Sequence, residues 1–256
     1  MRLYFAIGQA SDNRVALFKK ENVRRVLISY ASVAGESEIS IPFEDVMIDS
    51  GAFGVETGVS KVNLKGYTLW LQLYLDKYPQ IKTCVNLDIL SDPDKSMRNL
   101  EYMESEGLHP MPVYHYGEET EVLDKLCSKY EYVGIGGMAV GTMANTNLQK
   151  FWEFVCDRYL DNKFHVFGVG TMTPFFRKQP FSLDCTSWNV GARFGDLMGY
   201  RGGLPFRWSA REMYGMKFFF TTEELFSNNI RAMLDWEKLE WTKSVEVEEG
   251  DQGRLL

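Results

Sequence analysis

Three aspartates each come directly after a short apolar segment, and carboxylates gathered in one place can do acid–base and nucleophilic chemistry. They are Asp49, Asp88 and Asp184. Two carboxylates in one pocket suit a double-displacement glycosyl reaction, because one attacks the sugar carbon while the other handles the proton of the leaving group. A single aspartate at a strand end is also a common N-cap of the next helix. The coincidence of three such positions therefore indicates a site.

Two glycine-rich segments, residues 134–141 and 168–171, also follow apolar runs. Glycine leaves room for a flat ligand and exposes backbone N–H and C=O groups to it. Phe53 and Phe167 lie beside such ends, and aromatic rings can stack on the two faces of a base. Neither segment matches G-x-G-x-x-G followed by an acidic residue for a ribose, and no G-x-x-x-x-G-K-[ST] occurs. These features disfavour dinucleotide binding and favour a pocket for a planar heterocycle.

The elements that must position these residues alternate along the chain. Eight apolar, β-branched or aromatic runs predict strands at Leu3–Ile7, Val26–Tyr30, Val46–Ile48, Thr83–Leu87, Met111–Tyr114, Tyr132–Ile135, Phe164–Phe167 and Phe181–Leu183. Amphipathic stretches between them predict helices over 59–78, 96–106, 118–130 and 145–159, with Asp94 and Asn145 as N-caps. This alternation predicts a parallel sheet. Eight such units fit a single (β/α)8 TIM-type barrel, whose C-terminal strand ends share one face; an open doubly wound sheet is the alternative.

We expect one domain over residues 1–243, ending in a helix over 222–243, and a weakly ordered acidic tail over 244–256. The four cysteines are too far apart for a C-x-x-C pair, so no metal site and no zinc subdomain are expected. No segment approaches the ~20 apolar residues of a membrane span. The apolar run near the N-terminus is too short for a signal peptide. The chain is therefore predicted to be soluble and cytoplasmic.

Charge is unevenly distributed along this acidic chain, whose net charge is −7. Residues 175–217 carry seven basic side chains against three acidic ones, whereas residues 221–256 carry nine acidic against four basic. A basic segment can form a local phosphate-binding surface on an acidic protein; an ordinary solvated face is the alternative. The candidate contacts to nucleic acid are Arg177, Lys178, Arg193, Arg201, Arg207 and Arg211.

Four short segments, in order along the chain, resemble motifs of the guanine transglycosylase superfamily, barrel enzymes that exchange guanine in a polynucleotide for a 7-deazaguanine. Residues 49–53, D-S-G-A-F, resemble the family's D-S-G-G-[FY]. Residues 136–141, G-G-M-A-V-G, resemble G-G-L-A-V-G. Residues 168–171 match G-V-G-T, and Asp184-Cys185 matches the D-C pair that holds the nucleophile.

The resemblance implies a role for each matched position. Asp184 would be the nucleophile, Asp49 the general acid and base, and Asp88 the acceptor for the guanine edge. The other residues expected to bind substrate are Ser50, Phe53, Gly136, Gly137, Met138, Phe167 and His115, with Phe53 and Phe167 stacking on the base. An ordinary aspartate titrates near ~4, so Asp49 needs burial or a neighbouring carboxylate to hold a proton at neutral pH. Asp184 must stay ionised.

Two departures from the family pattern bear on the substrate. The tRNA enzymes carry a C-x-C-x-x-C…H zinc site that this chain lacks, and they have a glutamine where this chain has residues 113–117, V-Y-H-Y-G. A zinc-free version is more like the DNA guanine transglycosylases of phage and bacterial 7-deazaguanine modification systems. The resemblance therefore implies DNA and a free 7-deazaguanine as partners, no cofactor and a monomer. The alternatives are a tRNA substrate, an N-glycoside hydrolase with the same two aspartates, and a non-catalytic nucleic-acid-binding subunit.

Overall fold

The computed structural model describes residues 1–7, 12–35, 41–52, 62–90, 92–138, 145–169, 178–201, 204–209 and 220–238. Eight parallel strands form one sheet: β1 (Arg2–Ile7), β2 (Arg25–Ser29), β3 (Asp45–Asp49), β4 (Ile81–Cys84), β5 (Val113–His115), β6 (Tyr132–Gly136), β7 (Lys163–Val166) and β8 (Ser182–Cys185). Each overlaps one of the eight predicted runs, although β4 begins two residues before its predicted run and ends three residues before the end of that run. Their order across the sheet is β4-β3-β2-β1-β8-β7-β6-β5.

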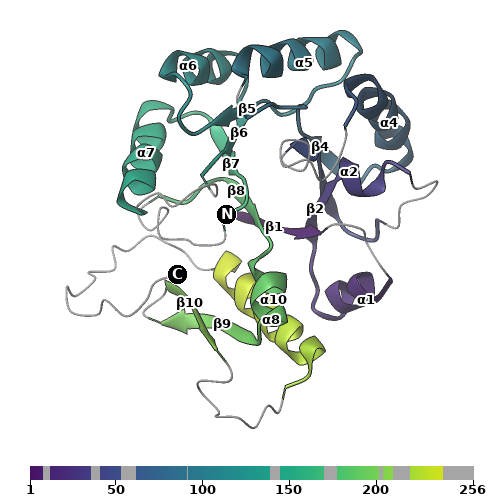
Figure 1. Ribbon diagram of the computed structural model, residues 1–256, viewed down its shortest axis with the longest axis vertical. Coiled ribbons are helices and arrows are strands. Elements are labelled where there is room, and N and C mark those ends of the chain that lie inside the picture. The colour runs from purple at the N-terminus through teal and green to yellow at the C-terminus, as the bar shows by residue number, and fades with distance from the viewer. Residues whose placement is uncertain are drawn as a thin grey trace.

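The sheet is strongly curled, as Figure 1 shows. Its two edge strands, β4 and β5, are linked by one isolated parallel bridge between Val85 and Met111. The Met111 N–H donates to the Cys84 carbonyl at 2.8 Å, and the Asn86 N–H donates to the Met111 carbonyl at 2.9 Å. Among the described residues no further ladder joins these edges. The predicted barrel is therefore observed as a curled, TIM-barrel-like sheet rather than the open doubly wound alternative.

Side chains alternate between the two faces of the sheet, as the period of two along a strand requires. On β3, Val46 and Ile48 pack in the large outer core under the helices. Met47 lies in a second, inner cluster with residues of β1, β2 and β5. Asp45 and Asp49 share the parity of Met47, so they lie on the inner side, at opposite ends of the strand. Asp49 is therefore on the inner side because of the alternation, and at the C-terminal end of the sheet because it is the last residue of β3.

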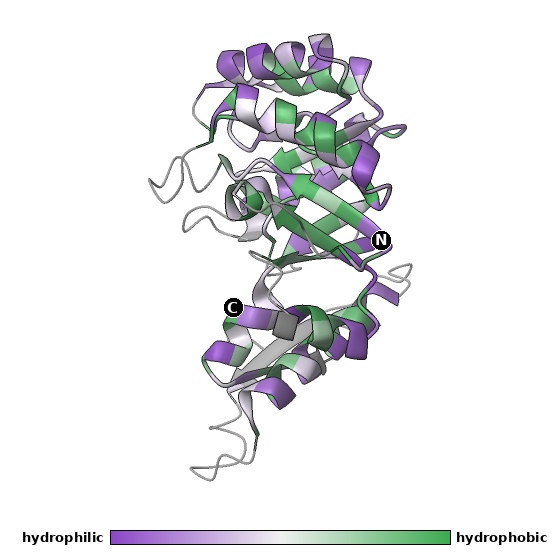
Figure 2. Cartoon of the chain, turned by 90° about the vertical axis from the view of Figure 1, so that its right-hand side faces the viewer, coloured by the Kyte–Doolittle hydropathy of each residue, from purple (hydrophilic) through white to green (hydrophobic). Residues whose placement is uncertain are grey.

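Helices cover the outer side of the sheet: α1 (Asp12–Lys20), α2 (Tyr30–Val33), α4 (Leu64–Lys77), α5 (Pro93–Ser105), α6 (Thr120–Lys129), α7 (Asn145–Arg158), α8 (Ser187–Arg193) and α10 (Thr222–Lys238). In Figure 2 the strands are largely hydrophobic and the outward parts of the helices are hydrophilic. No helix in the described part of the chain combines the length and apolar character needed to cross a membrane.

Helix α5 begins earlier than the sequence predicted. The side chain of Asp92, and not that of Asp94, accepts the Lys95 N–H at 2.8 Å, and Pro93 occupies the first turn. Proline suits that position because it has no N–H to leave unpaired and its φ is already helical. Asp94 lies in the first turn, where a carboxylate favours the positive end of the helix dipole.

An antiparallel pair of strands, β9 (Asp196–Arg201) and β10 (Leu204–Ser209), follows α8 and was not predicted. A small apolar cluster of Ala192, Leu197 and Leu225 joins α8, β9 and α10. Helix α10 ends at Lys238 in the described chain, and the expected acidic tail over 244–256 lies outside the described residues. Its Glu237 accepts the Leu3 N–H at 2.8 Å and pairs with Arg25 at 2.7 Å. The C-terminal helix is therefore tied to the starts of β1 and β2.

Gly134→Ala tests the packing inside the sheet. A Cβ at this position would lie 2.6 Å from Cε2 of Phe167 and 3.2 Å from Val113. Because the Phe167 ring packs within the inner cluster, we expect the free energy of unfolding to fall by about 1–3 kcal/mol. Urea denaturation measures the change.

Gly35→Ala is the matched control, because nothing lies within 4 Å of a Cβ placed at Gly35. An equal loss of stability in the two variants would contradict the packing around Gly134.

Candidate functional site

The three aspartates converge at the C-terminal ends of the strands. Asp49 ends β3, Asp88 follows β4, and Asp184 lies near the end of β8. Strands β3 and β8 are separated by β2 and β1 in the sheet, so only the curl brings their ends together. The charges of Asp88 and Asp184 both act on Asp49 and raise its pKa. The structure therefore brings together the three carboxylates that the sequence singled out.

Asp49 is the carboxyl whose ionisation these surroundings change most. Burial raises its pKa, and the negative charges of Asp88 and Asp184 raise it further. Backbone hydrogen bonds from Gly51 and Ser50 oppose this, and the resulting pKa is about 7. At neutral pH Asp49 is therefore present in both protonation states, which suits a group that gives a proton and then takes one.

The turn after β3 depends on glycine at position 51. Its N–H donates to Oδ2 of Asp49 at 3.0 Å, and its φ is +82°. A Cβ there would lie 2.6 Å from the Cβ of Ala31. Ser50 is fully buried; its Oγ accepts the Ala52 N–H at 3.2 Å and contacts Oδ1 of Asp88 at 3.4 Å. The D-S-G-A segment thus hydrogen-bonds the Asp49 side chain through Gly51 and the Asp88 side chain through Ser50.

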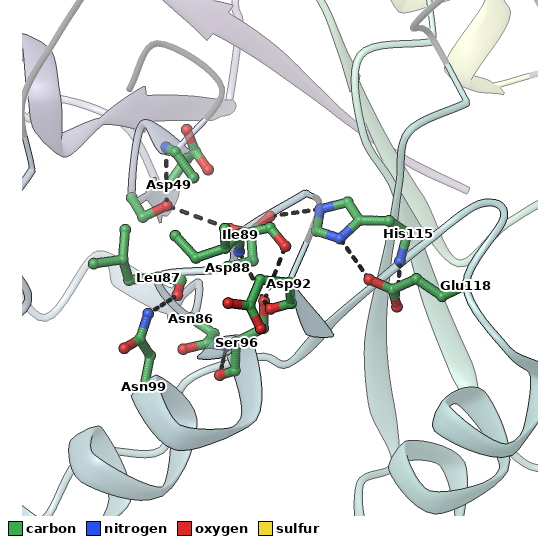
Figure 3. A network of polar contacts seen from close by, with 12 residues as sticks. Asp49, Asn86, Leu87, Asp88, Ile89, Asp92, Ser96, Asn99, His115 and Glu118 are labelled. Carbon is green, nitrogen blue, oxygen red and sulfur yellow. Dashed lines mark hydrogen bonds and ion pairs between the residues drawn. The ribbon is translucent and has the colours of Figure 1, made fainter. Parts of the chain in front are cut away.

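Asp88 is held by a buried histidine, which is in turn held by a second carboxylate (Figure 3). Nε2 of His115 lies 2.8 Å from Oδ2 of Asp88, and Nδ1 lies 3.2 Å from Oε1 of Glu118. Burial alone would lower the pKa of His115, but the hydrogen bonds to Asp88 and Glu118 outweigh it and raise the pKa to about 9. At neutral pH His115 is an imidazolium between two carboxylates, and Asp88 is fixed as a hydrogen-bond acceptor.

Side chains and a backbone carbonyl in the first two turns of α5 form hydrogen bonds with the segment that contains Asp88. Ser96 Oγ accepts the Ile89 N–H at 2.7 Å, and its backbone carbonyl accepts the Asn86 amide at 2.9 Å. The Asn99 side chain donates to the Leu87 carbonyl at 2.7 Å. Figure 3 shows these contacts beneath Asp88. The position of this carboxylate is therefore set by buried polar contacts on both of its sides.

Asp184 is buried, and two nitrogen atoms lie within hydrogen-bond distance of one of its oxygens. The Gly168 N–H donates to Oδ1 at 2.9 Å, and Nε2 of His165 lies 3.3 Å from the same atom. Gly168 has a φ of +67°, which favours glycine. The G-V-G-T segment thus contributes a backbone donor to the carboxylate that the sequence marked as the nucleophile.

The remaining predicted substrate contacts differ in what surrounds them. Gly136 packs against His115, since a Cβ would lie 2.6 Å from its ring, and Gly137 has a φ of +77°. Met138 is buried in the outer core. The Phe167 ring meets His165 edge to face, with centroids 4.5 Å apart. Phe53 lies outside the described residues.

The predicted phosphate contacts are only partly described. Arg193 is exposed in the last turn of α8, and the Lys178 ammonium pairs with the Asp157 carboxylate. Arg177 and Arg211 lie outside the described residues, and Arg201 and Arg207 are placed by their backbone alone on β9 and β10. A basic surface for nucleic acid thus remains a prediction.

Sequence reasoning missed Glu118 and did not include His165 among the site residues. Two signals were available. Glu118 follows the inward-facing His115 by three residues, and His165 alternates with Phe164 and Val166 of the outer core. The second pattern places His165 on the inner side of β7.

Fold and site together define an α/β protein with a TIM-barrel-like parallel sheet and a cluster of three carboxylates at its C-terminal strand ends. No protein-family model matches the chain. No curated protein matches it significantly in sequence. What the chain does must therefore be argued from the site itself.

Asp49→Asn tests the ionisation of the carboxylate cluster. Between ~4, where an unfolded aspartate titrates, and about 7, native Asp49 holds a proton that the unfolded chain has lost. Rising pH therefore lowers the free energy of unfolding of the native protein across this window. The stability of the variant relative to the native protein should rise by about 1–3 kcal/mol between pH 4 and pH 8, measured by urea denaturation.

The exposed Asp94 supplies the control, since Asp94→Asn should show no such rise. A flat difference for Asp49→Asn as well would mean that Asp49 is ionised throughout.

Glu118→Gln tests the imidazolium. Protonation of His115 stabilises the fold fully below ~6.5, and this contribution is lost as pH rises through about 9. Removing one carboxylate partner should lower the pKa of His115 by about one pH unit, which an NMR titration of its ring measures. Glu119→Gln, at an exposed neighbouring acid, should leave the titration unchanged. Equal titration in both variants would rule out the Glu118 contact as its cause.

Proposed function

We propose that this protein is a transglycosylase that exchanges guanine in DNA for a 7-deazaguanine derivative through a covalent aspartyl–glycosyl intermediate. On this proposal the chain is a single (β/α)8 barrel without a zinc subdomain. The observation that carries it is the convergence of Asp49, Asp88 and Asp184, with the pKa of Asp49 raised to about 7 by burial and by the other two charges. Two of the motifs that resemble the guanine transglycosylases contain Asp49 and Asp184, and Asp88 follows the fourth predicted strand.

The reaction divides the three carboxylates between separate tasks. Asp184 attacks C1′ of the target nucleotide as the bond from C1′ to guanine breaks, through an oxocarbenium-like transition state. Asp49 gives its proton to the departing guanine. It then takes a proton from the incoming 7-deazaguanine, whose nitrogen attacks C1′ and displaces Asp184. One N-glycosidic bond replaces another, so no energy source is needed.

Asp88 suits recognition of the base. A guanine edge presents N–H donors, and Asp88 is a carboxylate held as an acceptor by His115. The His115 imidazolium also offsets negative charge beside Asp49, which would otherwise add to the repulsion in the pocket. Because the acceptor is fixed before the base arrives, little free energy is lost in ordering it.

DNA is the preferred polynucleotide because the sequence lacks the cysteine and histidine spacing of the zinc site in the tRNA enzymes. In duplex DNA the target nucleotide must be flipped out of the stack, at a cost of a few kcal/mol. A non-catalytic binding subunit is disfavoured, because binding a polynucleotide needs no buried aspartate that titrates near neutral pH.

The test is exchange of labelled guanine into DNA, together with a denaturing gel that detects a covalent protein–DNA adduct. Asp184→Asn should form no adduct and show no exchange. Asp49→Asn should exchange about 10²-fold more slowly or worse, because general acid–base catalysis is lost. Asp94→Asn, at an exposed position on α5, should match the native protein.

Each alternative gives its own result in this assay. Free guanine and abasic sites formed without any deazaguanine would indicate a hydrolase. Exchange into tRNA in preference to DNA, in a mixture of the two, would reassign the polynucleotide. Native rates in both aspartate variants would overturn the proposal.

A further inference from the structure

A chain of four polar groups runs inside the curled sheet and ends at Asp184. The Tyr132 hydroxyl lies 2.5 Å from Oγ of Ser182, which lies 2.7 Å from Nδ1 of His165. Nε2 of His165 lies 3.3 Å from Oδ1 of Asp184. His165 and Ser182 are fully buried, and the exposed fraction of Asp184 is 6%. These groups come from β6, β7 and β8, so the sheet itself sets their spacing.

The position of each proton along this chain follows from counting donors and acceptors. An ionised Asp184 can only accept, so the facing Nε2 must carry a hydrogen. In a neutral imidazole Nδ1 then accepts, and the only donor near it among the described residues is the Ser182 hydroxyl. The Ser182 oxygen is left to accept the Tyr132 O–H. The Tyr132 hydroxyl, the Ser182 hydroxyl and the His165 Nε2–H then each donate one hydrogen bond, as buried polar groups require.

Two aromatic rings hold the imidazole of His165 in place. Tyr4 meets His165 edge to face at 5.8 Å between centroids, and Phe167 does so at 4.5 Å. Both rings belong to the inner apolar cluster or pack against it. Apart from Asp184, no charged side chain of the described residues bonds to this imidazole.

We propose that His165 is a positioning residue for the nucleophile: its neutral Nε2–H tautomer, held by Ser182 and Tyr132, fixes Oδ1 of Asp184. This inference rests on the proposed function, since it concerns the same carboxylate. Oδ1 takes the hydrogen bonds from Gly168 and His165, and Oδ2 has no donor among the described residues. Oδ2 is therefore the oxygen left to attack C1′. A nucleophile held in this way keeps the alignment on which rate depends.

The first test observes the tautomer directly and needs no substrate. The chain has three histidines, so protein labelled with 15N-histidine gives three ring systems, assigned with His109→Gln and His115→Gln. We expect His165 to be neutral with its proton on Nε2 between about pH 6 and pH 8. An imidazolium, or a proton on Nδ1, would overturn the proposal whether or not the protein is a transglycosylase.

Two variants test the direction of the chain. Asp184→Ala removes the carboxylate that Nε2–H faces, so the Nδ1–H tautomer, donating to Ser182, should become populated. Tyr132→Phe leaves Asp184 in place and the Ser182 hydroxyl free to donate to Nδ1, so the Nε2–H tautomer should persist. The Nε2–H tautomer alone in both variants would mean that Asp184 does not direct the proton, and the proposal would fail.

The second test uses kinetics to distinguish a role of His165 in positioning Asp184 from a role in the stability of the fold alone. His165→Gln keeps an amide N–H able to reach Oδ1 of Asp184, whereas the shorter side chain in His165→Asn does not. We expect the kcat of guanine exchange to fall about 10²-fold in His165→Asn and about tenfold or less in His165→Gln. The KM for the deazaguanine should stay within about twofold in both variants, because Asp88 and not His165 meets the base.

The outcomes distinguish the two proposals. Equal kcat in the asparagine and glutamine variants would overturn the role of His165. Native protein without exchange activity would instead overturn the proposed function, and the tautomer measurement would still decide whether His165 orients Asp184. Thermal unfolding of each variant confirms that it is folded before its kinetics are compared.

Discussion

Mutual repulsion among three carboxylates is the constraint around which the rest of this structure is arranged. Asp49, Asp88 and Asp184 lie close enough for the last two to raise the pKa of the first, and each is accommodated in a different way. Asp49 retains a proton to about pH 7, Asp88 is paired with the His115 imidazolium, and Asp184 accepts the Gly168 N–H and lies against the His165 ring. The three aspartates thus differ in their hydrogen bonds and charge pairing because their neighbours differ.

Strand β6 makes this arrangement sterically feasible. Both of its inward-facing positions above Tyr132 are glycines, and the rings of Phe167 and His115 occupy the space that side chains at Gly134 and Gly136 would fill. His115 can therefore reach across to Asp88 from β5, and Phe167 can pack on His165. The glycine-rich segment was interpreted from sequence as room for a ligand. In the described structure its first two glycines make room for the protein's own rings.

The strands could be predicted from sequence because each overlaps a short run rich in apolar, β-branched or aromatic residues. The strand-end aspartates could be predicted because parallel strands present their C-terminal ends on one face. The N-cap of α5 was predicted two residues too late, although Pro93, which suits the first turn, favours Asp92 as the cap. The β9–β10 pair packs on α10, a contact set by tertiary structure. The links from His115 to Glu118 and from His165 to Ser182 depend on side-chain directions that only the fold determines.

The bond between the Leu3 N–H and Glu237 joins residues 234 positions apart in the chain. Strand β1 also lies in the middle of the sheet, where one of its two neighbours is β8, near residue 184. Such long-range pairings carry the entropy cost of closing a very large loop before any contact is gained. During synthesis the first strand must therefore wait, with one edge unpaired, until most of the chain has left the ribosome. Until β8 is made, that unpaired edge is open to pairing with other chains, so the topology carries an aggregation risk during folding.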